Sequence, residues 1–171
     1  MTNNDLLIRL RYALDIKDVD MVKIFGLGGV ELTRDEVKKI LFKRPEEDGI
    51  FQDAETEKNY MACNFKMLDG FLNGFITFKR GAQEPKAGQA SIQRELPKDH
   101  PNNLFLKKVK VALSLTTDDL LAIFKAGGAE VTKSELSALF RKPDHKHYRK
   151  CLDSSIRKFL MGMAGTYRPR G

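Results

Sequence analysis

The sequence contains one phrase twice. GGVELTRDEVKKILFKRP occupies residues 28–45, and GGAEVTKSELSALFRKP occupies residues 127–143. Shifting the chain by 99 residues also places Asn3-Asn4 on Asn102-Asn103. Similarity that recurs in order along a chain indicates a duplicated structural unit, so each copy must form much the same set of elements.

The correspondence continues to the end of both copies with two changes of offset. At an offset of 98, Leu41-Phe42 meets Leu139-Phe140, and at an offset of 88, Tyr60 to Cys63 meets Tyr148 to Cys151. The extra residues of the first copy fall in an acidic insertion. The sequence therefore predicts three parts: a first helical repeat at 1–81 with the insertion at 46–59, a polar linker at 82–101, and a second helical repeat at 102–171.

Each copy predicts four helices. The first helix follows an asparagine cap, and the second begins near Asp18 or Thr116. The glycine pair closes the second helix, and Thr33 or Thr132 begins the third with a glutamate three residues later, the spacing of a capping box. The fourth and longest helices are predicted at 57–79 and 146–164. The expected fold is all-α, with two tandem four-helix repeats related by internal duplication and packed through their long fourth helices.

Helix 57–79 is predicted to be apolar on two sides. Besides the face that matches the second copy, Met61, Phe65 and Ile76 add a second apolar side. A helix that is apolar on two sides is expected to be buried on two sides. The three residues are therefore interface candidates, for contact with the other repeat or with a second chain as a protein-interaction or dimerisation module.

Composition favours a folded cytoplasmic protein. Hydrophobic residues make up 42% of the 171 residues and charged residues 31%, which argues against disorder. The chain opens without the basic leader and apolar run of a secretion signal, and no stretch matches a membrane span. Two cysteines do not form a disulfide framework, so a reducing compartment is expected.

The basic character belongs to the second repeat. Residues 102–171 hold 14 Lys/Arg and 6 Asp/Glu, a net of +8, whereas residues 1–81 hold 13 and 14, a net of −1. This asymmetry predicts an acidic partner, and sequence-tolerant nucleic-acid binding by the second repeat is the leading hypothesis. The candidate binding residues are Lys133, Arg141, Lys142, Lys146, Arg149, Lys150, Arg157 and Lys158.

Part of this basic set is expected to form a stripe. Lys146, Lys150 and Arg157 would lie on one side of the predicted last helix, interrupted by Asp153. A solvated face or a protein partner is the alternative interpretation. The helix–turn–helix pattern around Thr132 also suggests base reading in the major groove, but the turn is longer than the tight turn typical of that motif.

Other chemistry finds little support in the sequence. His145 and His147 near Cys151 could suggest metal ligation, but a tetrahedral site needs more converging ligands. The glycines at 26–29 follow a predicted helix rather than a strand, which disfavours a nucleotide loop. No catalytic residues, cofactor or metal are therefore expected, and the chain is interpreted as a non-enzymatic binding protein.

Three stretches resemble a known family. With the repeated Asn-Asn start, TTDDLLAIF at 116–124 and FRKPDHKHYRKCLDSSIRKFLMGM at 140–163, the chain resembles the YehS-like family of bacterial proteins. The resemblance covers both repeats and is most specific around 143–146. It implies a tandem repeat of a domain of unknown function in a bacterial cytosol, with no known activity or site residues. The insertion at 46–59 is longer than the family's first repeat implies.

Overall fold

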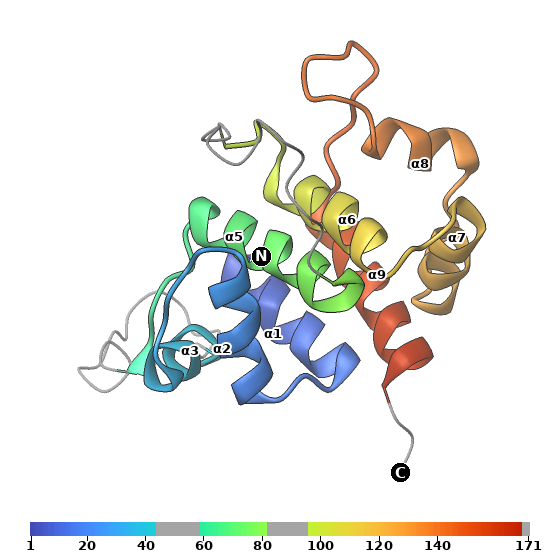
Figure 1. The fold of residues 1–171 in the computed structure, drawn as a ribbon. Coiled ribbons are helices and arrows are strands. Elements are labelled where there is room, and N and C mark those ends of the chain that lie inside the picture. Colours follow the sequence, from blue (N-terminus) through green and yellow to red (C-terminus); the bar gives the residue numbers. More distant parts are fainter. Residues whose placement is uncertain (44–58, 82–95, 169–171) are drawn as a thin grey trace, which may run out of the picture.

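All regular structure in the described part of the chain is helical (Figure 1). The computed structural model describes residues 1–43, 59–81 and 96–168. The predicted acidic insertion, apart from Asn59, and most of the predicted linker lie outside these ranges. The helices are α1 (Asn3–Leu14), α2 (Asp18–Leu27), α3 (Arg34–Ile40), α5 (Phe65–Arg80), α6 (Pro101–Ala112), α7 (Thr117–Ala126), α8 (Lys133–Leu139) and α9 (Asp153–Tyr167). The all-α duplicated fold is confirmed.

The two repeats exchange contacts reciprocally. Helix α5 packs against α2 of its own repeat and α6 of the other, and α9 packs in the same way against α7 and α1. Figure 1 shows α1, α5, α6 and α9 at the centre, with α2 and α3 on one side and α7 and α8 on the other. The fourth helices thus join the repeats as predicted, and across the repeats each packs mainly against the first helix of the other repeat.

The fourth helices begin later than predicted. Helix α5 starts at Phe65 rather than 57, and α9 starts at Asp153 rather than 146. The segments before them, 60–64 and 146–152, are not helical. Their backbone groups are held by side chains of the first helix of the same repeat, and this contact competes with helix formation.

The side chains that hold these segments come from the repeated asparagines, which are not helix caps. Thr2 caps α1 and His100 caps α6, so the asparagines lie inside the first turn. The buried Asn4 side chain donates to the carbonyls of Ile40 and Met61 at 3.0 and 2.8 Å. Its oxygen accepts from the Cys63 N–H at 2.9 Å. One amide thus ties the end of α3 and the start of α5 to α1.

The second repeat has the same cross-link. Asn103, fully buried, donates to the carbonyls of Leu139 and Arg149 at 3.1 and 2.8 Å and accepts from the Cys151 N–H at 2.8 Å. These bonds correct the predicted correspondence at one place. Because Ile40 and Leu139 occupy the same position, the offset of 99 extends through Leu139, and the one-residue deletion follows it.

Glycines set the distance between the second and fourth helices. A Cβ on Gly28 would lie 1.6 Å from the Gly70 carbonyl oxygen, and one on Gly127 would lie 1.7 Å from that of Lys158. No other residue type leaves room for this approach. The following glycine of each pair has positive φ, 84° at Gly29 and 90° at Gly128, as expected for the end of a helix.

The close approach brings equivalent aromatic residues together. Phe25 of α2 meets Phe71 of α5 with ring centroids 4.8 Å apart, and Phe124 of α7 meets Phe159 of α9 at 5.1 Å. All four rings are fully buried. Each repeat therefore has the same aromatic contact in its core.

Candidate nucleic-acid interface

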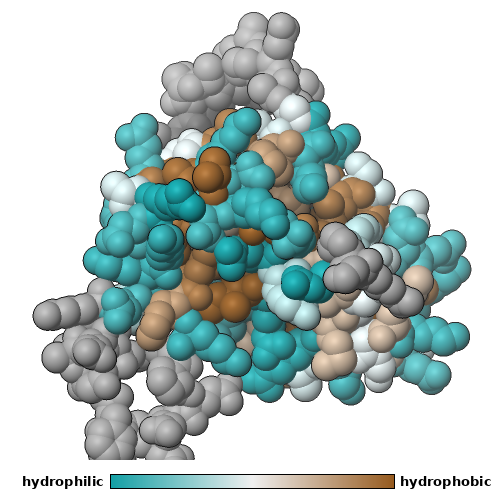
Figure 2. Space-filling view, turned by 90° about the horizontal axis from the view of Figure 1, so that it is seen from below, coloured by the Kyte–Doolittle hydropathy of each residue, from teal (hydrophilic) through white to brown (hydrophobic). Residues whose placement is uncertain are grey.

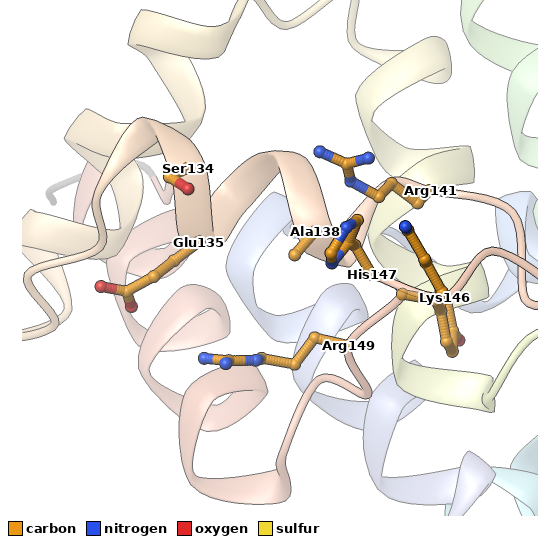
Figure 3. A pocket seen from close by; sticks show the side chains of 8 residues that line it. Ser134, Glu135, Ala138, Arg141, Lys146, His147 and Arg149 are labelled. Atoms are coloured by element: carbon orange, nitrogen blue, oxygen red, sulfur yellow. The ribbon is translucent and has the colours of Figure 1, made fainter.

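Three of the predicted basic residues line one hollow. Arg141, Lys146 and Arg149 surround a depression of about 440 Å³ beside α8. Helix α8 contributes Ser134, Glu135 and Ala138, and the segment after it contributes His147 and Tyr148. Figure 3 shows these side chains around the opening, with Arg141 and Lys146 near one end and Arg149 across from Glu135. We call this depression the α8 hollow.

The backbone around the α8 hollow is fixed from inside the protein. The Arg149 N–H donates to the Ala138 carbonyl at 3.1 Å, and the Arg149 carbonyl accepts from Asn103 at 2.8 Å. The His147 N–H donates to the His145 Nδ1 atom at 3.0 Å. Because this backbone is bonded on both sides, the charged side chains project from a defined platform instead of a free loop.

The charge of the α8 hollow is positive. Three cations face one carboxylate, Glu135, and none of the three forms an ion pair within the part of the chain that the structure describes. The Arg141 guanidinium lies 3.4 Å from the His145 Nε2 atom. Unpaired cations that line a concave surface are suited to phosphate oxygens.

The other predicted basic residues lie elsewhere. Lys133 lines a second depression on α8 together with Arg141. Lys142 is exposed in the segment after α8, and Lys158 is exposed on α9. Lys150 lines a depression beside His100 and Asp153, and Arg157 lines one between α1 and α9. The eight candidates thus form several separate groups.

The predicted stripe along the last helix is therefore wrong. Lys146 and Lys150 precede α9, whose first residue is Asp153, and only Arg157 lies on the helix. The helical spacing does not apply to this segment, because it is not helical and its Arg149 carbonyl and Cys151 N–H bond to Asn103. Lys146 belongs to the α8 hollow, whereas Lys150 and Arg157 do not.

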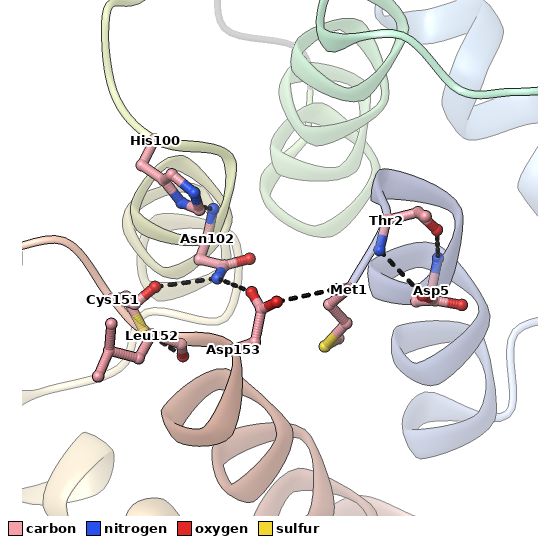
Figure 4. Close-up of polar contacts among 8 residues, drawn as sticks. All are labelled: Met1, Thr2, Asp5, His100, Asn102, Cys151, Leu152 and Asp153. Atoms are coloured by element: carbon pink, nitrogen blue, oxygen red, sulfur yellow. Dashed lines mark hydrogen bonds and ion pairs between the residues drawn. The ribbon is translucent and has the colours of Figure 1, made fainter.

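Asp153 is occupied by structural contacts. Its carboxylate accepts from Asn102 at 2.9 Å and from the Met1 amino group at 2.8 Å (Figure 4). These two hydrogen bonds lower the pKa of Asp153. Nearby, burial lowers the pKa of His100, with a further contribution from the charge of Lys150. This cluster joins the start of α1 to the start of α9 across the repeats.

The geometry of α7 and α8 disfavours base reading in a groove. Six residues, 127–132, separate the two helices, and α8 has 7 residues, about 10 Å of helix. A DNA-reading helix–turn–helix has a tighter turn of three to four residues. Lys133 and Ser134 are exposed at the start of α8, but the helix is short for a major-groove element.

The predicted interface residues are used within the chain. Phe65 and Ile76 on α5, and Met61 before it, are half-buried against the core. Helix α5 contacts α2 of its own repeat and α6 of the other, so it packs against both repeats as expected. Met61 also bonds through its backbone, donating to the Lys39 carbonyl and accepting from Asn4.

The cysteines are buried thiols. Burial raises the pKa of Cys63 and of Cys151 to about 12. A thiol with so high a pKa is protonated at neutral pH and is a poor nucleophile and metal ligand. Among the residues that the structure describes, no three His, Cys, Asp or Glu side chains gather as metal ligands. Over the same residues, no helix has the length and apolarity to cross a bilayer.

Sequence reasoning missed how the α8 hollow is assembled. Its wall includes Glu135 and Tyr148, which helical periodicity assigned to no site. Tyr148 accepts from the His100 N–H at 3.2 Å, and burial raises its pKa. The available signal was Asn64, a residue type that commonly caps helices, which begins α5 and matches Leu152 at the offset of 88.

Comparison with known proteins supports the duplication. The model of a family described as "Protein of unknown function (DUF1456)" matches twice, at residues 3–81 and 102–169. The chain is also 38% identical over 164 residues to "Uncharacterized protein YehS" of Escherichia coli (strain K12), covering 96% of this chain and 95% of that protein. No solved structure matches. The predicted resemblance is confirmed, and the chain belongs to the DUF1456 family as two tandem copies of its domain.

Proposed function

We propose that this chain is a non-enzymatic, cytoplasmic binding protein whose second repeat contacts nucleic-acid phosphates through the α8 hollow. The observation that carries the proposal is the convergence of Arg141, Lys146 and Arg149 on one fixed concave surface. Phosphate contacts supply affinity without sequence information, so binding should tolerate many sequences.

The first repeat lacks the same surface. Asp35 stands where the α8 hollow has Ser134, and Met61 stands at the position of Arg149. Lys39, at the position of Ala138, pairs with Asp35 at 3.4 Å. An acidic side chain and an internal ion pair make this region less suited to phosphate. Binding is therefore assigned to the second repeat alone.

A salt series tests the proposal. Labelled duplex DNA, duplex RNA and single strands are titrated by fluorescence anisotropy with the native chain and with the double variant Arg141→Gln/Arg149→Gln. On duplex DNA, each phosphate contact contributes about 0.9 to the slope of log affinity against log salt, so the variant should lose about 1.8. Removing two cations from the exposed counterpart helix, Arg34→Gln/Lys38→Gln, gives the matched control.

Two results would overturn the proposal. One is no binding to any of these nucleic acids even at low salt. The other is an equal loss of affinity in the control, which would show that only the net charge of the protein matters. Circular dichroism of both variants establishes that the fold is retained.

The alternative proposal, a second chain docked on α5, needs an apolar side of that helix that is free of other contacts. Helix α5 already contacts α6 of the same chain, and Phe65 and Ile76 are partly buried against the core. Under the nucleic-acid proposal the protein needs no partner subunit there, and sedimentation is expected to give a monomer. A dimer that is disrupted by Phe65→Lys, with the monomer still folded, would restore the rival.

A further inference from the structure

The repeats meet at two equivalent junctions, α5 with α6 and α1 with α9, and different side chains occupy the two. Between α5 and α6, Leu104 is 2% exposed and Ile76 packs against the core. The Lys108 ammonium donates to the Asn73 side chain at 2.9 Å across the junction. Large side chains and a polar bridge thus close this pair of helices.

The matching positions between α1 and α9 carry different residues. Asp5 replaces Leu104, Arg9 replaces Lys108, and Ala164 replaces Ile76. A groove of about 320 Å³ lies here, lined by these three residues among others. We call it the α1–α9 groove. Its volume is at the lower end of the range for small-molecule sites.

The wall of the α1–α9 groove is partly apolar. Ile8 comes from α1, and Leu160, Met161 and Ala164 come from α9. Met161 is 61% exposed, although it lies beside buried Leu160. Apolar side chains also reach the surface between hydrophilic ones on the face shown in Figure 2. A long unbranched chain could cover such a wall.

The rim of the α1–α9 groove has excess positive charge. Arg9, Lys43 and Arg157 line it, against one carboxylate from Asp5. Asp5 already accepts from the Thr2 N–H at 2.9 Å as part of the α1 cap. Within residues 1–43, 59–81 and 96–168, none of the three cations forms an ion pair. The equivalent of Arg157 in the other junction is Asp69, so this charge is particular to the α1–α9 side.

We propose that the α1–α9 groove binds an aliphatic carboxylate of medium chain length. The alkyl chain lies along Leu160, Met161 and Ala164, where it removes apolar surface from water. The carboxylate pairs with Arg9 and Arg157, whose planar guanidinium groups match its two oxygens. The site is separate from the α8 hollow and does not depend on nucleic-acid binding.

Calorimetric titration with decanoate, below its micelle concentration, tests the site. Affinity should fall roughly two- to fourfold for each methylene removed from the chain, as expected when methylenes leave water. Propionate, which lacks the chain, and decyltrimethylammonium, which reverses the charge, should not bind measurably. A duplex oligonucleotide should not displace decanoate.

Two variants locate the binding. Ala164→Ile introduces the side chain that fills the other junction and should reduce decanoate affinity at least tenfold. Arg157→Gln should weaken it about tenfold, the loss expected for a charge-assisted hydrogen bond. Arg34→Gln removes one exposed arginine elsewhere and is the matched control, with no change expected. Thermal unfolding shows whether each variant is folded. If Ala164→Ile does not fold, the affinity of Arg157→Gln for decanoate locates the site.

Several outcomes would overturn the proposal. Absence of decanoate binding removes the ligand. Equal binding of decyltrimethylammonium removes the role of the cations. Decanoate binding that is unchanged in both folded Ala164→Ile and folded Arg157→Gln places the ligand away from the α1–α9 groove.

Discussion

The two repeats differ most at positions exposed to solvent and least in the core. Both have the glycine crossing, the paired phenylalanines, and the buried asparagine that bonds to two carbonyls and one N–H. Yet the counterpart of Arg149 in the α8 hollow is Met61, and that of Arg157 in the α1–α9 groove is Asp69. The duplicated units therefore share their interior and differ in surface charge, so function is expected to reside in the differences.

The largest expected effect tests whether the crossings are equivalent. Gly127→Ala and Gly28→Ala each place a Cβ within 1.7 Å of a backbone oxygen, so the helices must separate. Each is expected to lower the free energy of unfolding by about 3 kcal/mol, measured by urea denaturation. Gly165→Ala, where a Cβ meets nothing within 4 Å, should instead stabilise by about 0.5–1 kcal/mol. A cost in one repeat only would show that the crossings are not equivalent.

Removal of either asparagine cross-link is expected to lower the free energy of unfolding slightly less. Asn103→Ala leaves two carbonyls and one N–H without their partner, and Asn4→Ala does the same in the first repeat. Each should lower the free energy of unfolding by about 2–3 kcal/mol in urea denaturation. Ser154→Ala, exposed on α9, is the control, expected within about 0.5 kcal/mol of native. Native stability of Asn103→Ala would contradict the assigned role.

A single exchange between repeats sharpens the difference at the α8 hollow. Arg149→Met introduces the residue of the first repeat at an exposed position, so stability should change by less than about 0.5 kcal/mol. The salt slope for duplex DNA should fall by about 0.9, the contribution of one phosphate contact. Anisotropy titrations measure the slope. An unchanged slope would exclude Arg149 from the nucleic-acid contact.

The smallest expected effect concerns the two different caps. Thr2 caps α1, whereas His100 caps α6 by accepting from the Asn102 N–H through its Nδ1 atom. Burial lowers the pKa of His100 below its usual 6.5, so the folded protein favours the neutral ring. Its contribution to stability is therefore present above pH 6.5 and is lost as pH falls through the lowered value. Because His100 is only partly buried, a loss of a few tenths of a kcal/mol is expected.

The measurement is urea denaturation of the native chain and of His100→Asn between pH 7.5 and 5. Asparagine is a good cap that does not titrate, so the variant should lose less stability on acidification. Identical pH dependence of the two proteins would exclude His100 as the titrating cap.

The sequence by itself determined the helices whose ends carry local signals. The capping box at Thr33 and Glu36 and the glycine after α7 function as predicted. At Thr132 only half of the predicted box forms, because its side chain accepts from the Glu135 N–H but Glu135 bonds to the Thr132 hydroxyl. The two apolar sides of α5 correctly indicated contacts with both repeats. These features depend on residues close in the chain or on a regular period, and both can be read without the fold.

The starts of the fourth helices and the grouping of the charges depend on long-range contacts in the folded chain. Apolar periodicity predicted that the last helix begins at 146. The Arg149 carbonyl instead accepts from the side chain of Asn103, 46 residues away in the chain. That long-range hydrogen bond breaks the predicted stripe and brings Lys146 and Arg149 to Arg141. The partners of such a buried amide are backbone groups, which every residue has, so no pattern in the sequence predicts them. The grouping of charged side chains at the surface therefore depends on the fold.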